Sequence, residues 1–152
     1  MTKKRSTALV GIIALAFVVL AAFAWGAVRK VQLDNSSSDF AVALLQESFS
    51  SGTGENLVAS IHPTTGASFP AELLSSQIQA ALDIVGPFQS MNTISGESNS
   101  ALIPLPGLEV KASYVIDLQL GETAVSAILD LQFIDAQWWL ENLQLDPLPD
   151  MN

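Results

Sequence analysis

Few side chains of this protein could carry out acid–base or nucleophilic chemistry. The chain has one histidine, His62, and one tyrosine, Tyr114, and it contains no cysteine. A catalytic imidazole or phenol needs a second polar group close by with which to exchange a proton. His62 precedes Pro63 in a turn-forming HPTTG run, whereas Tyr114 stands in an otherwise apolar alternation. We therefore interpret His62 as a turn residue and Tyr114 as a core residue, and we predict that the protein is not an enzyme.

Metal, cofactor and nucleic-acid sites are not expected either. One histidine, no cysteine and no close carboxylate–histidine motif argue against a metal site. The sequence has no glycine-rich phosphate loop and no serine-elbow motif, so we expect no cofactor. From Val31 onward one lysine stands against all fifteen acidic residues, a net charge of −14. Such a domain is repelled by phosphate backbones, so nucleic acid is not an expected partner.

The N-terminal region is a hydrophobic segment flanked by basic residues. Residues 7–28 carry no charge, and as a helix they would measure about 33 Å, enough to cross a bilayer core of about 30 Å. The basic residues at positions 3–5 precede the segment, and Arg29 and Lys30 follow it. Because the excess lies before the segment, we expect the N-terminus in the cytoplasm and the rest of the chain exported.

We interpret residues 1–6 as a basic cytoplasmic region and residues 7–28 as a single-pass signal anchor in the inner membrane of a bacterium, with a periplasmic domain. The alternative is a signal peptide cleaved after Ala24, because Ala22-Phe23-Ala24 has the small-x-small pattern. Both interpretations place the domain outside the cytoplasm.

The exported part is expected to form one domain. Residues 29–37 are polar and serine-rich and are predicted to be a tether, residues 38–147 the folded domain, and residues 148–152 a C-terminal tail. Ser36 and Asp39 have the spacing of a capping box, which predicts that a helix begins there and continues until a Ser-Ser-Gly run.

Two more helices are predicted before the strands. A short one covers residues 54–61, and a longer one begins at Pro70 and ends at Gly86-Pro87. The apolar residues of the longer helix recur with helical spacing and should face the core: Leu74, Ile78, Ala81, Leu82 and Val85.

After Gly86 the apolar residues recur at every second position, which predicts strands. Residues 88–94 are a predicted strand, residues 95–100 a loop and residues 104–107 a turn. A hairpin turn at Gly121-Glu122 sets a register in which every apolar residue meets an apolar partner. The predicted pairs are Leu118 with Val125, Ile116 with Ala127, Tyr114 with Leu129, Ala112 with Leu131, and Val110 with Phe133.

A second turn at Asp135-Ala136 begins the last strand. It brings Trp138 and Leu140 to the inner face and leaves Trp139 on the outer face. Leu143 and Leu145 then reach the inner face only if a bulge near Glu141-Asn142 shifts the phase.

This order of helices and strands resembles the nuclear-transport-factor-2-like (cystatin-like) superfamily. The resemblance covers about residues 36–145 and is strongest to small uncharacterised membrane-anchored or exported bacterial domains of that class. The sequence features that carry it are Gly86-Pro87-Phe88-Gln89-Ser90, Leu105-Pro106-Gly107, Tyr114 and Gln137-Trp138-Trp139-Leu140. It implies an α+β fold in which two to three helices pack on a curved antiparallel sheet of about four strands. Members of the class include enzymes, ligand carriers and interaction modules, so the fold alone does not assign a function.

Two function hypotheses follow. On the outer sheet face Val115, Ile128 and Trp139 are predicted to form an apolar patch that contacts a protein partner or a second copy of the chain. The leading hypothesis is therefore a membrane-tethered, non-enzymatic interaction module, such as an accessory or assembly subunit of an envelope complex. The alternative is a binder of a small apolar ligand in the cone between sheet and helix. The resemblance implies that catalytic members place polar groups in that cone, where this chain offers Tyr114 as the possible pocket residue.

Overall fold

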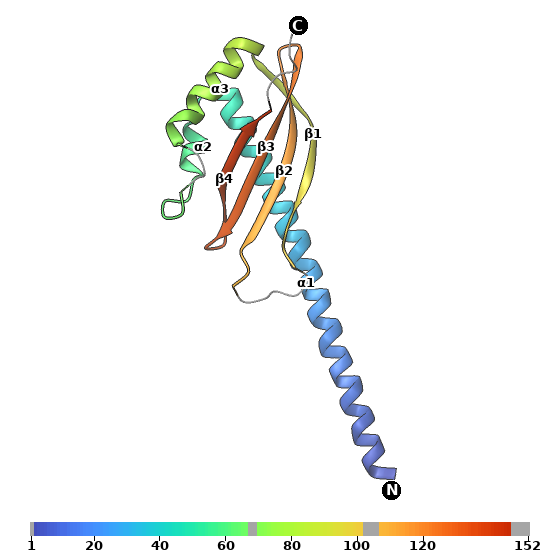
Figure 1. Ribbon diagram of the computed structural model, residues 1–152. Helices are drawn as coiled ribbons and strands as arrows, with labels where there is room; N and C mark the ends of the chain where they lie inside the picture. Colours follow the sequence, from blue (N-terminus) through green and yellow to red (C-terminus); the bar gives the residue numbers. More distant parts are fainter. Residues whose placement is uncertain (1, 67–69, 102–106, 147–152) are drawn as a thin grey trace.

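The computed structural model describes residues 2–66, 70–101 and 107–146, and the fold is α+β. A long N-terminal helix is followed by two short helices and an open four-stranded antiparallel sheet of order β1-β2-β3-β4. The elements are α1 (Thr2–Ser51), α2 (Glu55–Ala59), α3 (Ala71–Val85), β1 (Phe88–Ser98), β2 (Val110–Leu120), β3 (Thr123–Ile134) and β4 (Gln137–Leu145). The sheet lies along the C-terminal half of α1, and the N-terminal half extends away from the domain (Figure 1).

Helix α1 runs without a break from the apolar N-terminal segment into the domain, which corrects the predicted tether over residues 29–37 and the predicted helix start at Ser36. Its apolar part is long enough to cross a membrane. Leu33 and Ser37 are buried and continue the helical spacing of the core residues that follow them on α1. The Ser37 hydroxyl donates to the Leu33 carbonyl oxygen at 2.8 Å, so the helix itself supplies its partner. The serine-rich segment is therefore helical, and it is part of the domain.

The other helices agree with their predicted positions. Helix α2 lies within residues 54–61, and α3 follows Pro70 and ends before Gly86. Strand β1 is longer than predicted, because residues 95–98 are strand and not loop. Of the predicted turn at residues 104–107, positions 104–106 lie outside the described residues, as does the tail at residues 148–152.

The predicted strand register is confirmed. All five predicted pairs between β2 and β3 occur, from Leu118 with Val125 to Val110 with Phe133. Asp135 and Ala136 form the second turn, with φ angles of 51° and 63°. In β4 the register shifts by one residue, so that Leu140 pairs with Leu131 and Asn142 with Asp130. Glu141 is thus the extra residue of the predicted bulge.

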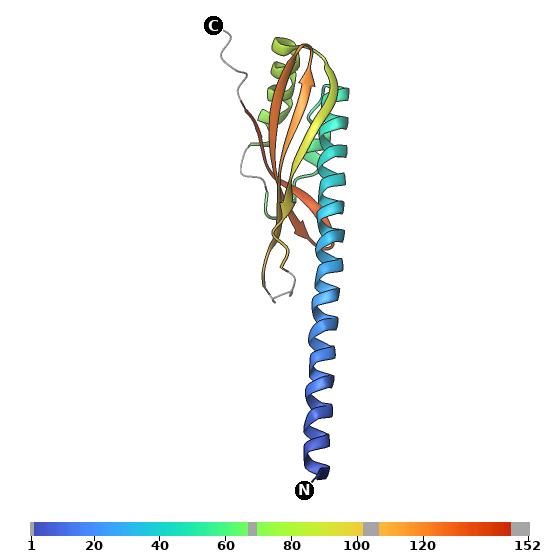
Figure 2. The same cartoon turned by 90° about the vertical axis from the view of Figure 1, so that its right-hand side faces the viewer.

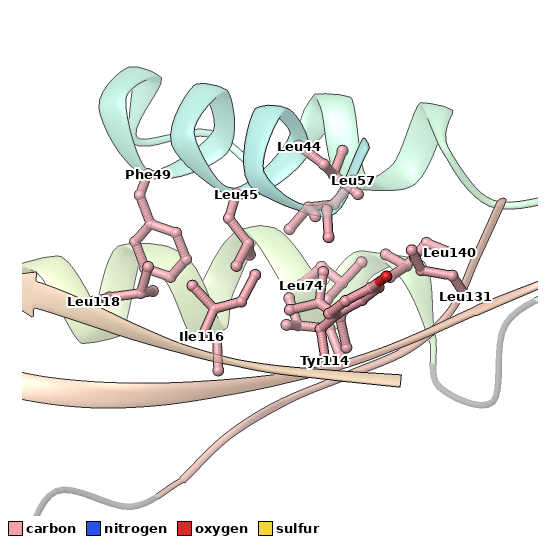
Figure 3. Close-up of a cluster of buried hydrophobic side chains, with 14 of the residues drawn as sticks. Leu44, Leu45, Phe49, Leu57, Leu74, Tyr114, Ile116, Leu118, Leu131 and Leu140 are labelled. Atoms are coloured by element: carbon pink, nitrogen blue, oxygen red, sulfur yellow. The ribbon is translucent and has the colours of Figure 1, made fainter. Parts of the chain in front are cut away.

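The core lies between the inner sheet face and α1, with α2 and α3 closing the remaining side. Figure 3 shows Leu45 and Phe49 pointing from α1 towards Ile116 and Leu118 of β2. Leu74 and Ile78 of α3 belong to the same buried cluster as the core residues of α1, so both helices pack towards the inner sheet face. Figure 2 shows α1 running along one face of the sheet, and no described helix packs on the outer face, where Val115 is exposed. The layer order therefore leaves the outer sheet face and the β4 side of the domain as the places where a site could lie.

Candidate functional site

Tyr114, the possible pocket residue, lies in the buried core. Its side chain is 3% exposed. The ring faces Gly96 of β1, where an added Cβ would come within 2.8 Å of a ring carbon. The hydroxyl lies 2.7 Å from Ser37 Oγ and 3.1 Å from the Asp34 carbonyl oxygen. Burial raises the pKa of Tyr114, which keeps the phenol protonated. These contacts make Tyr114 a residue that joins β2 to α1.

A polar cluster fixes α1 to the end of β1. The Asp34 carboxylate accepts hydrogen bonds from the Ser98 hydroxyl and, at 2.9 Å, from the Ser98 backbone N–H. Lys30 Nζ lies 3.3 Å from both Asp34 and Glu97, and it donates to the Ser98 carbonyl oxygen at 3.1 Å. Burial alone would raise the pKa of Asp34, but the bonds from Ser98 and the charge of Lys30 outweigh it and hold the pKa below its usual value. Because these groups satisfy one another, the cluster is interpreted as structural.

His62 serves the turn in which it lies and partly covers Trp139. Its Nδ1 atom accepts the backbone N–H groups of Thr64 and Thr65 at 3.2 and 3.3 Å. The ring packs against Trp139 in a T-shaped contact with centroids 4.9 Å apart. The predicted turn role agrees with these contacts, whereas the contact with Trp139 joins residues 77 positions apart and has no local sequence signal.

The outer sheet face holds a shallow polar hollow of about 390 Å³. Lys111 Nζ donates to Glu141 at 2.6 Å, and Asp130 accepts from Ser113 at 2.6 Å and from Asn142 at 3.1 Å. The bond to Glu141 raises the pKa of Lys111. These side chains bind one another and are open to solvent, so we interpret them as a solvated charge cluster. Within the described part of the chain no three carboxylate or imidazole groups lie together as metal ligands would.

The predicted apolar patch on this face is not continuous. Val115 pairs with Ile128, as expected. Trp139 pairs with Gln132, however, and the row containing Asp130 lies between it and Ile128. Side chains two rows apart on one sheet face are separated by the row between them. We therefore correct the three-residue patch to a Val115–Ile128 pair and a separate Trp139, which His62 partly covers.

A larger and more apolar groove lies between α3 and the ends of β3 and β4. Its volume is about 560 Å³. Apolar residues dominate its walls, and Ile84 is 69% exposed there. The lining residues are Gln77, Ala80, Ala81, Ile84 and Val85 on the helix side and Val125, Leu143, Gln144, Leu145 and Asp146 on the sheet side. This groove is the strongest candidate site.

The sheet side of the groove is a strand edge, because β4 is the last strand of the sheet and no other described strand pairs with it on that side. Near its middle this edge is closed by one hydrogen bond from the Leu140 N–H to the Ser60 carbonyl oxygen, 2.8 Å long. The Asp146 N–H bonds back to Ser126 of β3. Since strand residues alternate in direction, the N–H and C=O groups of Leu143 and Leu145 point to the open edge beside the groove.

Sequence reasoning missed this groove, although a signal for it exists. The predicted core stripe accounts for only part of the apolar surface of α3. Leu73, Ala80 and Ile84 form a second stripe at helical spacing, and all three are exposed. One apolar stripe is enough to pack a helix against the core, so a second, exposed stripe on α3 indicates a possible binding surface.

A comparison of the chain with protein-family models, with characterised proteins and with solved structures finds no match, so the geometry above is the basis for any functional assignment.

Proposed function

We propose that this protein is a membrane-anchored, non-enzymatic module that binds an extended segment of a partner protein in the groove between α3 and β4. The observation that carries the proposal is the combination of apolar walls with an open strand edge. An added strand can bond to the free backbone groups of such an edge, and alternate side chains of that strand can fill the apolar groove. This places the contact on the β4 side of the domain and not on the outer sheet face.

The topology expected from the sequence is retained in the proposal. Helix α1 includes one segment that is long and apolar enough for a single pass. The three basic residues at positions 3–5 favour a cytoplasmic N-terminus, which puts the domain in the periplasm of a bacterium. The order of helices and strands also supports the proposed cystatin-like class.

The height of the groove favours a protein over a membrane lipid as the partner. Gly121 N–H donates to the Pro87 carbonyl oxygen at 2.8 Å, so the end of α3 lies at the β2–β3 turn. The Phe49 and Phe88 rings, 6.3 Å apart, place that end beside the last turns of α1. Helix α1 rises about 30 Å between Arg29 and Phe49. A lipid would have to leave the bilayer to reach the groove, whereas a periplasmic segment of another protein would not.

The charge of the domain adds a property of the partner. From Val31 onward the net charge is −14, and Asp146 lines one end of the groove. A segment with basic residues beside its apolar ones would be attracted to this surface and oriented on it.

A small apolar ligand is the second candidate, and the volume of the groove favours it. About 560 Å³ lies within the range of ligand sites, roughly 300–1,000 Å³. In this version the ligand lies at the edge of the domain and not beside Tyr114 in the cone.

Site-specific photo-cross-linking in cells tests the proposal. A photoreactive residue at position 84 lies in the groove, whereas one at position 73 lies on the same stripe of α3 but about 16 Å along the helix, beyond the residues that line the groove. Both native side chains are exposed, so neither change disturbs the core. We expect a discrete protein adduct at position 84 and none at position 73.

A second variant shows whether the adduct depends on the groove. Ala80→Glu adds a charge to the groove wall, and Ser76→Glu adds the same charge to exposed α3 surface elsewhere. The adduct should be lost with Ala80→Glu and kept with Ser76→Glu. Equal adducts at positions 84 and 73 would refute the proposal. A co-purified small molecule that Ala80→Glu removes, seen by native mass spectrometry without any protein adduct, would establish the ligand alternative.

A further inference from the structure

The membrane-facing end of the domain lies very close to the apolar segment. Arg29 directly follows the uncharged residues 7–28. Lys30, one position later, already contacts Glu97 and the Ser98 carbonyl oxygen at the end of β1. No residues remain between anchor and domain that could act as a spacer. Any bilayer that α1 crosses must therefore meet this end of the domain.

This end also exposes apolar side chains. Leu108, just before β2, is 55% exposed, and it lines a small hollow together with Arg29 and Ala101. On α1, Trp25 and Val28 are exposed to a similar or greater degree. Figure 2 shows the end of β1 and the start of β2 pointing along α1 towards its N-terminal half. The exposed apolar side chains of helix and sheet thus lie at one level of the molecule.

The membrane-facing end holds two basic residues beside the acidic residues Asp34, Glu97 and Glu109. After residue 28 the chain has three basic residues, and Arg29 and Lys30 are two of them. Lys30 binds Asp34 and Glu97, whereas Arg29 lies in the hollow with Leu108 and with the acidic residue Glu109. A guanidinium next to exposed leucine and tryptophan matches the layered chemistry of the bilayer surface, where phosphates lie above acyl chains.

We propose that this end of the domain is a lipid-contacting surface, with Leu108 and Trp25 in the interfacial layer of the membrane that α1 crosses and Arg29 at its phosphates. The inference rests on the membrane anchoring in the proposed function. It goes beyond that function, because contact with the membrane would fix the orientation of the domain in addition to retaining it at the membrane. As a result, the groove between α3 and β4 faces the periplasm at a fixed height above the membrane surface.

The absence of native cysteine allows a direct test with single labels. The full-length protein is placed in vesicles of phosphatidylcholine and phosphatidylglycerol, with and without a lipid that carries a shallow spin-label quencher. An environment-sensitive fluorophore is attached at Leu108→Cys. The matched control is Val115→Cys, which replaces another exposed apolar residue on the outer sheet face. We expect the label at position 108 to lose fluorescence with the quencher lipid and the label at position 115 to keep it.

Two further variants separate the possible outcomes. A label at Ala14→Cys, inside the apolar segment, reports anchoring itself. Loss of fluorescence at position 14 without loss at position 108 overturns the surface contact and leaves the anchor intact. No loss at position 14 overturns both. A label at Ala101→Cys with Leu108 unlabelled checks that the fluorophore does not drive insertion. Its quenching should occur with native Leu108 and disappear with Leu108→Asp, and quenching that survives Leu108→Asp contradicts the role assigned to Leu108.

Discussion

At the scale of single residues, Trp138 and Trp139 are neighbours in the chain with different surroundings. Trp138 is 8% exposed, its ring lies 5.0 Å from that of Phe133, and its Nε1 atom donates to Ser36 Oγ at 2.9 Å. Trp139 faces the other side of the sheet, contacts His62 and donates from Nε1 to the Ile134 carbonyl oxygen at 3.3 Å. Replacing Trp138 therefore tests the packing of the inner sheet face, and replacing Trp139 tests that of the outer face.

We predict that Trp138→Ala lowers the free energy of unfolding by about 3–5 kcal/mol, because it leaves a large cavity in the core. Trp139→Ala should cost about 1 kcal/mol, since it removes one edge contact and one modest hydrogen bond. Thermal melts of the full-length chain in detergent measure both. An equal or reversed order would mean that the register of β4 is displaced by one residue.

Asp34 gives the structure a defined response to acid. Its pKa is lowered in the folded state, so the folded state favours the charged carboxylate more than the unfolded state does. The stabilisation is complete at pH values above the ordinary pKa of 3.8 and is lost as the pH falls through the lowered value. We predict that Asp34→Asn destabilises the protein at neutral pH and that the difference from the native chain shrinks as the pH falls below about 4.

Unfolding curves between neutral and strongly acid pH test this prediction. Asp39→Asn is the matched control, because it removes a charge from an exposed position on the same helix without contacting Ser98. A loss of the same size and pH course in both variants would show that the bonds to Ser98 are not its source.

At the scale of elements, the β3–β4 turn contains backbone strain. Asp135 and Ala136 both have positive φ, at 51° and 63°. Two-residue turns of this kind favour asparagine or aspartate followed by glycine, because a Cβ is crowded at positive φ. We predict that Ala136→Gly raises the free energy of unfolding by about 1 kcal/mol. The thermal midpoint of the full-length chain should rise accordingly, and a fall would contradict the assigned turn geometry.

The same elements show what a sequence can predict. The β2–β3 register follows from a two-residue turn and strict alternation, since a slip of one residue would turn Ile116 and Leu118 to solvent. The bulge at Glu141 follows from the change of phase between Leu140 and Leu143. Local spacing and turn chemistry are sufficient for both features.

Features that depend on distant partners could not be predicted in this way. Residues 29–37 look like a linker, yet their helix is held by Tyr114, Ser98 and Trp138, which lie 64 to 102 positions away. The groove between α3 and β4 depends on how far the helix stands from the sheet edge, and composition does not determine that distance. The separation of Trp139 from Ile128 was derivable from the register, because the row containing Asp130 lies between them.

At the scale of the whole molecule, the 50-residue helix α1 links the apolar segment to the candidate groove as one body. The domain is bound to α1 from Lys30, by the cluster with Asp34 and Ser98, as far as Phe49 in the core. A flexible linker would let the groove sample many heights and orientations. A continuous helix instead sets its height at about 30 Å above the end of the apolar segment.

This rigidity predicts how the molecule responds to insertions between Val28 and Arg29. Seven residues of strong helix formers add nearly two whole turns, which raise the domain by about 10 Å with little rotation. An insert of seven glycine and serine residues has the same length in residues but forms a flexible chain without a fixed end-to-end distance. A donor label at Ile84→Cys with acceptors on lipid headgroups measures the height by energy transfer. We expect one narrow height for the native chain, the same narrow distribution about 10 Å higher for the helical insert, and a broad one for the flexible insert. A native distribution as broad as that of the flexible insert would show that the domain turns freely on its anchor, and a fixed presentation of the groove would then be excluded.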